Sequence, residues 1–336
     1  MVSTPVRIAL RDAIAEEMRK NSNIFLIGEE VGEYEGAYKV SQGLLAEFGP
    51  KRIVDTPITE AGFTGLAIGA AMGGLYPIVE FMTWNFAFQA MDQIINSAAK
   101  THYMSGSKIN IPIVFRGPNG SALQVAAQHS HDFSSLFSNI PGLIVISPYD
   151  SADAKGLLKS SIRNSNPVIF LEHELLYGES FEVPEFDYST PIGLASVKLA
   201  GNDVTITAFS RGVKLALEAA KILKSNNVSA EVIDLRSLRP LDLKTIIESV
   251  KKTNRLLVID EDVPGGASAY ILQNIIEEQD AYNYLDSEPQ TLTAKPHRPA
   301  YGKDGDYLSK PSTEDVFEKV YAMMHEVNPA KFPSIY

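Results

Sequence analysis

Short apolar runs recur along the chain, separated by longer segments in which apolar residues return every three or four positions. The runs predict strands buried on both faces, and the spaced segments predict helices that cover those strands. In the first half of the chain the predicted strands are Ile24–Ile27, Ile53–Val54, Ile78–Phe81, Pro112–Phe115, Leu143–Ile146 and Val168–Leu171. The predicted helices are residues 7–20, a glycine-rich helix that begins at Glu60, residues 85–104 and residues 151–163.

The same alternation starts again after a stretch rich in proline and glycine. Mixed polarity and these breakers predict a linker over residues 181–203. The second series of strands is Val204–Thr207, Glu231–Asp234, Leu256–Ile259 and Thr291–Thr293, with helices ending near Lys224, starting at Leu243, spanning 267–279 and starting at Thr313. We therefore predict two α/β domains, residues 1–180 and 204–336, each with helices on its sheet.

Composition narrows the classes of function. The 336 residues include 41 acids against 30 bases, for a net charge of −11, whereas a nucleic-acid binder usually carries a basic face. Cysteine is absent, which excludes disulfides, thiolate metal sites and a cysteine nucleophile.

Membrane insertion is not expected either. The uncharged stretch Ala61–Val79 is divided by glycines and Pro77 into a helix and a strand, and it is too broken for a membrane span. The first residues lead directly into an amphipathic helix without an apolar signal core, which predicts a cytoplasmic protein of bacterial type, or a mitochondrial matrix protein if this is a mature organellar chain.

Glu60 stands between a proline-containing turn and the glycine-rich helix. Gly62, Gly65, Gly69 and Gly73 follow at spacings of three and four, so they share one helix face, which we expect to pack closely on a neighbour. By spacing alone, Glu60 is a carboxylate that suits the positive end of a helix dipole.

Other motifs of common enzymes are missing. The loop Gly28–Gly32 after the first strand carries charged residues where a dinucleotide would need close backbone approach. His129 and His131 are one residue apart, and no third metal ligand follows at a recognisable spacing. The residues alone therefore indicate a two-domain α/β protein with a site at the strand ends.

Several stretches together resemble one family, the β subunit of the E1 component of 2-oxoacid dehydrogenase complexes, most closely the pyruvate type. They occur in order along nearly the whole chain, and they are Gly28–Gly32, Asp55–Glu60, Glu80–Phe86, Phe115–Gly120, Ala127–Ser130 and Asp234–Leu241.

The resemblance implies a fold and a reaction. The fold is a thiamine-diphosphate-binding pyrimidine domain followed by a transketolase C-terminal-like α/β domain. The reaction is decarboxylation of a 2-oxoacid with transfer of the acyl group to lipoyl groups of the E2 dihydrolipoamide acyltransferase. Glu60 would then hydrogen-bond the aminopyrimidine ring of the cofactor and activate it, which a carboxyl in a dry pocket does more readily than one in water.

Other positions match the family one by one. Ile58, Met82 and Phe86 match residues that pack on the pyrimidine ring, and Gln89 lies near them, although Met82 and Phe86 also fit ordinary core packing. His129 matches a histidine that orients or protonates the 2-oxoacid. The family also binds K⁺, largely through backbone oxygens, and the matching positions are Ile113, Ser161, Ile162, Asn164 and Asn166, with Asn164 in place of the usual acid.

One absence indicates a partner chain. Asp304–Asp306 lacks the preceding glycine of the Gly-Asp-Gly motif that holds Mg²⁺ and diphosphate in thiamine enzymes. The resemblance thus implies an E1 α subunit that holds them, an α2β2 assembly and an active site at the α–β interface. Residues 295–301 depart from the family pattern, which leaves the residues that dock E2 unassigned.

Two alternatives remain open at this point. Branched-chain 2-oxoacids or acetoin would use the same chemistry in a pocket of different width, shared with the α chain. A non-catalytic assembly subunit that only supports the α chain and E2 would need neither this chemistry nor this pocket.

Overall fold

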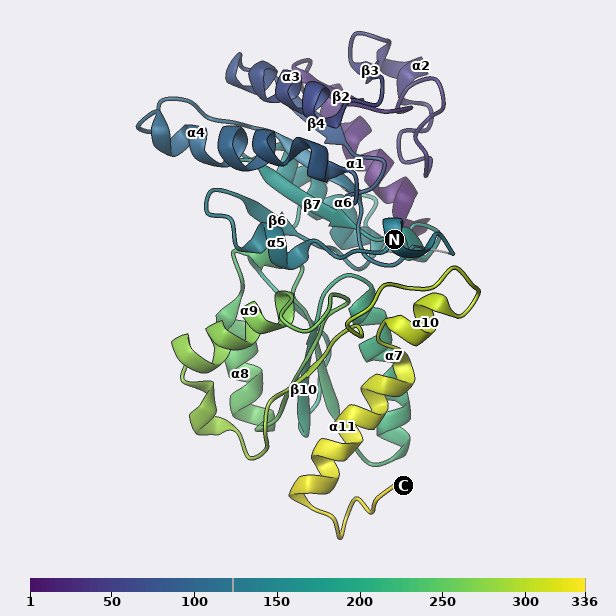
Figure 1. The fold of residues 1–336 in the computed structure, drawn as a ribbon, viewed down its shortest axis with the longest axis vertical. Coiled ribbons are helices and arrows are strands. Elements are labelled where there is room, and N and C mark those ends of the chain that lie inside the picture. Colours follow the sequence, from purple (N-terminus) through teal and green to yellow (C-terminus); the bar gives the residue numbers. More distant parts are fainter. Residues whose placement is uncertain (123, 336) are drawn as a thin grey trace.

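Two α/β bodies are stacked along the long axis of the molecule in the computed structural model, which describes residues 1–122 and 124–335 (Figure 1). The upper body contains a seven-stranded sheet in the order β12-β6-β7-β5-β4-β2-β3. Its strands are β2 (Ile24–Gly28), β3 (Ile53–Asp55), β4 (Tyr76–Glu80), β5 (Val114–Pro118), β6 (Ile144–Ile146), β7 (Val168–Glu172) and β12 (Ser237–Arg239). All neighbours in this sheet are parallel except β12 and β6.

Both faces of this sheet are covered, as the apolar runs predict. Leu26 of β2 and Phe170 of β7 belong to one buried cluster, and the next residues, Ile27 and Leu171, belong to a second cluster on the other face. Burying one such side chain stabilises the fold by roughly 1.5–3 kcal/mol.

The covering helices begin and end close to their predicted positions. In the upper body they are α1 (Val6–Lys20), α2 (Leu44–Phe48), α3 (Glu60–Met72), η1 (Ala87–Ala90), η2 (Gln93–Ala98), α4 (Ala99–Met104), η3 (Ala126–His129), α5 (Ser134–Ser138), α6 (Ser151–Ile162) and η4 (Glu174–Leu176). The helix predicted over residues 85–104 starts later, at Ala87. Its delay has a local cause, since the Asn85 backbone and side chain both donate to Thr83 Oγ1 and hold a turn there.

The lower body has a five-stranded sheet in the order β14-β13-β10-β11-β9. Its strands are β9 (Ser196–Leu199), β10 (Val204–Ala208), β11 (Ala230–Asp234), β13 (Leu256–Ile259) and β14 (Gln290–Leu292), and β1 (Val2–Pro5) pairs separately with β8 (Ser180–Val183). Its helices are α7 (Arg211–Ser225), α8 (Leu243–Thr253), α9 (Ala267–Gln273), η5 (Asn274–Glu278), η6 (Ala281–Tyr284), α10 (Gly305–Ser309) and α11 (Thr313–Val327).

The second half of the chain contributes one strand to the sheet of the upper body. β12 comes from the second half of the chain, yet it pairs antiparallel with β6 at the edge of the upper sheet. Arg239 extends this contact, because its Nη1 donates to the Ser138 carbonyl at 2.8 Å. The lower body is therefore hydrogen-bonded to the upper one and holds its loops at fixed positions.

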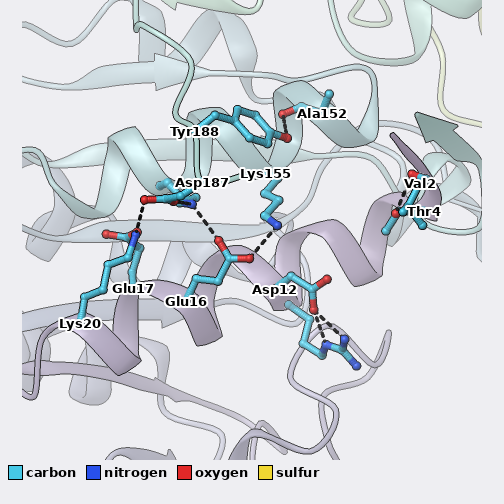
Figure 2. A network of polar contacts seen from close by, with 12 residues as sticks. Val2, Thr4, Asp12, Glu16, Glu17, Lys20, Ala152, Lys155, Asp187 and Tyr188 are labelled. Atoms are coloured by element: carbon cyan, nitrogen blue, oxygen red, sulfur yellow. Dashed lines mark hydrogen bonds and ion pairs between the residues drawn. The ribbon is translucent and has the colours of Figure 1, made fainter. Parts of the chain in front are cut away.

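A buried lysine joins α1 to α6 on the upper body. Lys159 is fully buried, and its Nζ donates to Glu16 at 2.7 Å and also to Asp187. Figure 2 shows Glu16 reaching Lys155 of α6, with Asp187 beside it. Burial acts to raise the pKa of Glu16, but hydrogen bonds from Lys155 and Lys159 outweigh burial and hold that pKa below its usual range.

Replacing Lys159 by methionine should lower the free energy of unfolding by about 1–2 kcal/mol at pH 7, because Glu16 loses one of its two cations. A carboxyl with a depressed folded pKa stabilises the fold above its ordinary pKa of 4.5, and the contribution disappears as pH falls through the folded value. The difference between variant and parent should therefore shrink in acid, as measured by urea unfolding at pH 7 and pH 4. Lys20→Met is the matched control at an exposed partner of Asp187, and an equal loss in both variants would contradict the account.

Candidate active site

Two buried carboxyl groups meet where the upper sheet ends. Glu29 directly follows β2, and Glu60 is the first residue of α3, just after β3. They are 5% and 2% exposed, and Glu29 Oε1 and Glu60 Oε2 have no hydrogen-bond partner among the described residues. Buried polar atoms in folded proteins are nearly always paired, so two orphaned oxygens at one place indicate a site for a ligand.

Glu29 binds a proton more readily than a carboxyl group in water does. Burial raises the pKa of Glu29 to about 7, and the neighbouring Glu60 carboxyl adds to this by repulsion and by hydrogen bonding. Glu29 therefore carries a proton below about pH 7 and can hold it against Glu60. Sequence reasoning missed Glu29, although its place directly after a fully apolar strand was a usable signal.

Replacing Glu29 by glutamine should stabilise the β chain more at pH 8 than at pH 5, by about 1–2 kcal/mol. The folded pKa of about 7 lies above the ordinary 4.5, so the parent binds more protons when folded and loses stability as pH rises through this window. Urea unfolding of the full chain at the two pH values measures the difference. The exposed Glu33→Gln variant is the control, and a pH-independent effect of Glu29→Gln would contradict the raised pKa of Glu29.

The four other positions matched to the cofactor differ in exposure. Ile58 is 77% exposed and Gln89 is exposed, whereas Met82 and Phe86 are half-buried. Of the four, Ile58 and Gln89 are therefore the most accessible to a ligand or partner.

The prediction that the glycine face of α3 packs closely is confirmed at Gly65 and is wrong at Gly69. A Cβ placed on Gly65 would lie 3.3 Å from the side chain of Gln93 in η2, whereas a Cβ on Gly69 would meet no atom within 4 Å. Gly62 and Gly69 are exposed, and Leu66, between them on the helix, is 61% exposed. Within the described residues, close packing on this face is therefore limited to Gly65.

His129 is the last residue of η3. Its ring packs edge-on against Phe86 with the centroids 5.3 Å apart, and its Nδ1 has no partner among the described residues. His131 differs, since it stacks on Phe133 at 4.4 Å. Burial, with Arg298 nearby, lowers the pKa of His131 to about 4. Of the two histidines, His129 is the one free to contact a ligand.

A buried cluster of charged side chains joins three neighbouring strands of the upper sheet, β4, β5 and β7. Arg116 of β5 bonds Glu172 of β7 through Nε at 2.5 Å and also bonds Glu80 of β4. The Tyr177 hydroxyl donates to Glu172 at 2.7 Å. All four side chains are buried, so the cluster fixes three neighbouring strand ends in register. The apolar pattern did not indicate this cluster, because its members are single polar residues in or after apolar strands: Glu80 and Glu172 end β4 and β7, Arg116 lies in the middle of β5, and Tyr177 follows η4.

The five positions matched to a K⁺ site lie around the end of α6. Val168 N–H donates to the Ile113 carbonyl at 2.9 Å, and Asn164 N–H donates to the Ser161 carbonyl at 3.1 Å. Ile162 ends the helix, and Asn166 N–H donates to the Asn164 side-chain oxygen at 2.9 Å. Each carbonyl keeps a second lone pair, which suits an alkali ion. No group of three or more acidic, histidine or cysteine side chains that suits a metal occurs in residues 1–122 and 124–335.

Two family models match the chain in succession. Residues 3–179 match the transketolase pyrimidine binding domain, and residues 193–310 match the transketolase C-terminal domain. Within the described part of the chain, no helix is both long enough and apolar enough to cross a bilayer.

Curated relatives carry one shared description. The chain is 55% identical over 316 residues to the pyruvate dehydrogenase E1 component subunit beta of Rickettsia conorii, covering 94% of this chain and 96% of the relative. It is 53% identical over 327 residues to the same subunit of Rhizobium meliloti, covering 97% and 71%. It is 52% identical over 320 residues to the mitochondrial subunit of Saccharomyces cerevisiae, covering 94% and 87%.

Solved structures share the fold. A protein described as a split gene transketolase, inactive beta4 tetramer, superposes with a TM-score of 0.77 at 23% identity, covering 96% of this chain and 99% of that one. Transketolase from Leishmania mexicana superposes with a TM-score of 0.71 at 14% identity, covering 99% and 47%.

Proposed function

The chain belongs to the family of pyruvate dehydrogenase E1 β subunits, and we propose that Glu60 is its contact with the aminopyrimidine of thiamine diphosphate. One observation carries this assignment: a buried carboxyl with an unpartnered oxygen, beside a second carboxyl and under an uncovered face. An amine or ring nitrogen would satisfy that oxygen.

The residues fit the cofactor's chemistry. When bound, thiamine diphosphate supplies a nucleophilic ring carbon and accepts the electrons released by decarboxylation. The unpartnered oxygen of Glu60 would hydrogen-bond a ring nitrogen of the cofactor, and Glu29 beside it, with a pKa of about 7, can hold or release a proton near neutral pH. Ile58, Met82 and Phe86 present apolar surface to the pyrimidine, and Gln89 borders it.

His129 acts on the substrate side. Its free Nδ1 and its fixed contact with Phe86 place an imidazole beside the site without occupying it with an internal hydrogen bond. A histidine so placed orients the 2-oxoacid carboxylate and exchanges a proton with its oxygen.

An E1 α subunit completes this site in an α2β2 assembly. Glu60 lies under a face that this chain leaves open, where Ile58 and Leu66 are strongly exposed. We assign the diphosphate and Mg²⁺ to the α subunit, and pyruvate is the proposed substrate. The acyl group then passes to the lipoyl group of E2 dihydrolipoamide acyltransferase.

A K⁺ ion at the end of α6 would bind the carbonyls of Ile113, Ser161 and Ile162 with the turn at Asn164 and Asn166. It would fasten that turn to β5 and β7, whose far ends carry the Arg116 cluster. The cytoplasm, or the mitochondrial matrix, is the proposed location.

A substrate panel on the reconstituted α–β enzyme tests this function. We expect kcat/KM for pyruvate to exceed that for 3-methyl-2-oxobutanoate and for acetoin by at least about tenfold, the discrimination that a few methylene contacts supply. A preference for the branched-chain acid or acetoin would overturn the assignment of pyruvate. No turnover of any of them, with the α chain bound, would favour a non-catalytic assembly subunit.

A further inference from the structure

The loop that carries His129 runs from the end of β5 to the start of α5 and is closed at its neck. Gly120 N–H donates to the His131 carbonyl at 3.1 Å, and Phe133 N–H donates to the Asn119 side-chain oxygen at 2.9 Å. These bonds form the loop but do not by themselves fix its position relative to the rest of the molecule.

A carboxylate from the lower body contacts this neck. Glu261 lies two residues after β13, is 4% exposed, and accepts from Ser121 Oγ at 3.3 Å. A Cβ on Gly120 would lie 2.7 Å from Glu261 Oε2, so the neck rests directly on this carboxylate. Gly120 also has a φ of +78°, which glycine adopts without strain.

Two further residues hold Glu261 in place. His173, just after β7, bonds Glu261 Oε2 through Nε2 at 2.7 Å, and Arg211 of α7 donates to Oε1 at 2.7 Å. Leu175 N–H donates to His173 Nδ1 at 3.2 Å, so the hydrogen-bond pattern assigns the imidazole hydrogen to Nε2, where Glu261 accepts it. Each Glu261 oxygen therefore has its own strong donor.

Charge keeps this junction in one form. Burial alone would raise the pKa of the Glu261 carboxyl, but His173, Arg211 and Lys310 hold that pKa well below its usual range. Lys310 also donates to the Glu261 carbonyl at 2.7 Å, which fixes the backbone of the same residue. The carboxylate is thus a fixed acceptor throughout the neutral range.

The loop itself needs such an anchor. Gln124 and Ala126 have φ values of +56° and +58°, a left-handed conformation that is unfavourable for a residue other than glycine. Strained segments persist where their surroundings hold them. His129 lies three residues beyond Ala126 and follows this strained segment directly.

We propose that Glu261, held by His173 and Arg211, is a positioning residue for His129. It ties the neck of the loop to the lower body and so sets where the His129 imidazole lies against Phe86. The proposal rests on the proposed role of His129 in the reaction. It gives the lower body a part in the site.

A double-mutant cycle in the reconstituted α–β enzyme tests this. Glu261→Gln keeps the shape but leaves one oxygen for three donors, Ser121, His173 and Arg211. We expect kcat/KM for pyruvate to fall about 10–50-fold with thiamine diphosphate affinity within about threefold. In a His129→Ala background the same change should cost less than about twofold, because its effect passes through His129. Equal losses in both backgrounds would overturn the proposal.

Glu231→Gln is the matched control. Glu231 is equally buried, on β11 of the same sheet, and pairs with Lys252 away from the loop. We expect this variant to keep kcat/KM within about twofold of the parent. A loss equal to that of Glu261→Gln would show that any buried carboxylate of the lower body has this effect, and would contradict the specific role of Glu261.

Hydrogen exchange supplies a readout that needs no activity. In the full β chain, Ser121→Ala removes only the hydrogen bond from Ser121 to Glu261. We expect the amide exchange rate in residues 124–133 to rise at least about tenfold in Ser121→Ala and in Glu261→Gln. Unchanged exchange in Ser121→Ala would refute the tie even if Glu261→Gln fails to fold. An inactive parent enzyme would refute the role of His129 in the proposed function, while the exchange result would still decide the tie.

Discussion

Glu60→Gln should reduce turnover of the reconstituted α–β enzyme by at least about 10³-fold. Glutamine keeps the size of the side chain but cannot exchange a proton with the cofactor, and general acid–base groups typically contribute 10²–10⁴-fold. Single-turnover decarboxylation of pyruvate measures the effect, with size-exclusion chromatography to verify assembly.

The matched control is Glu33→Gln, an exposed acid four residues beyond Glu29. It should leave turnover within about twofold of the parent. Near-normal turnover in Glu60→Gln would contradict the assigned role, whereas loss of assembly in that variant alone would place Glu60 in the interface and not in the reaction.

His129→Ala should lower kcat/KM for pyruvate by about 10²–10³-fold while changing thiamine diphosphate affinity less than threefold. We propose that the imidazole acts on the 2-oxoacid, and its Nδ1 has no partner among the described residues while its ring packs on Phe86, so its loss should affect the 2-oxoacid and not the cofactor. Steady-state kinetics and cofactor titration on the same preparation separate the two quantities.

His131→Phe is the control for this histidine, since phenylalanine keeps the stacking on Phe133. With its pKa near 4, His131 is uncharged at neutral pH, so its replacement should leave the pH profile of kcat/KM unchanged. A loss in His131→Phe comparable to that in His129→Ala would mean that the loop as a whole, and not His129, carries the effect.

The sheets could be predicted from the sequence because each central strand is buried on both faces. Leu26 and Ile27 pack in different clusters, so β2 had to be apolar without alternation. Strand β12 could not be predicted, since Ser237–Arg239 is short and mixed and acquires its partner only when the two bodies meet.

The candidate site was predictable only in part. Glu60 and His129 were identified through their neighbours in the sequence, but Glu29 contacts Glu60 only because β2 lies next to β3 in the sheet. Glu261 is 88 residues from His173, and its contact with the loop depends on the packing of one body on the other. Apolar periodicity indicates which positions are buried. It does not indicate which polar side chains from distant parts of the chain contact each other.

The central claim is that this chain supplies the Glu60 half of a site that an α subunit completes. Thiamine diphosphate titration with Mg²⁺ in excess, on the β chain, the α chain and their mixture, tests it most directly. We predict that the mixture binds at least about 100-fold more tightly than either chain, and that Glu60→Gln in the β chain removes most of this gain. An α chain that binds the cofactor equally tightly with or without this chain would contradict the claim.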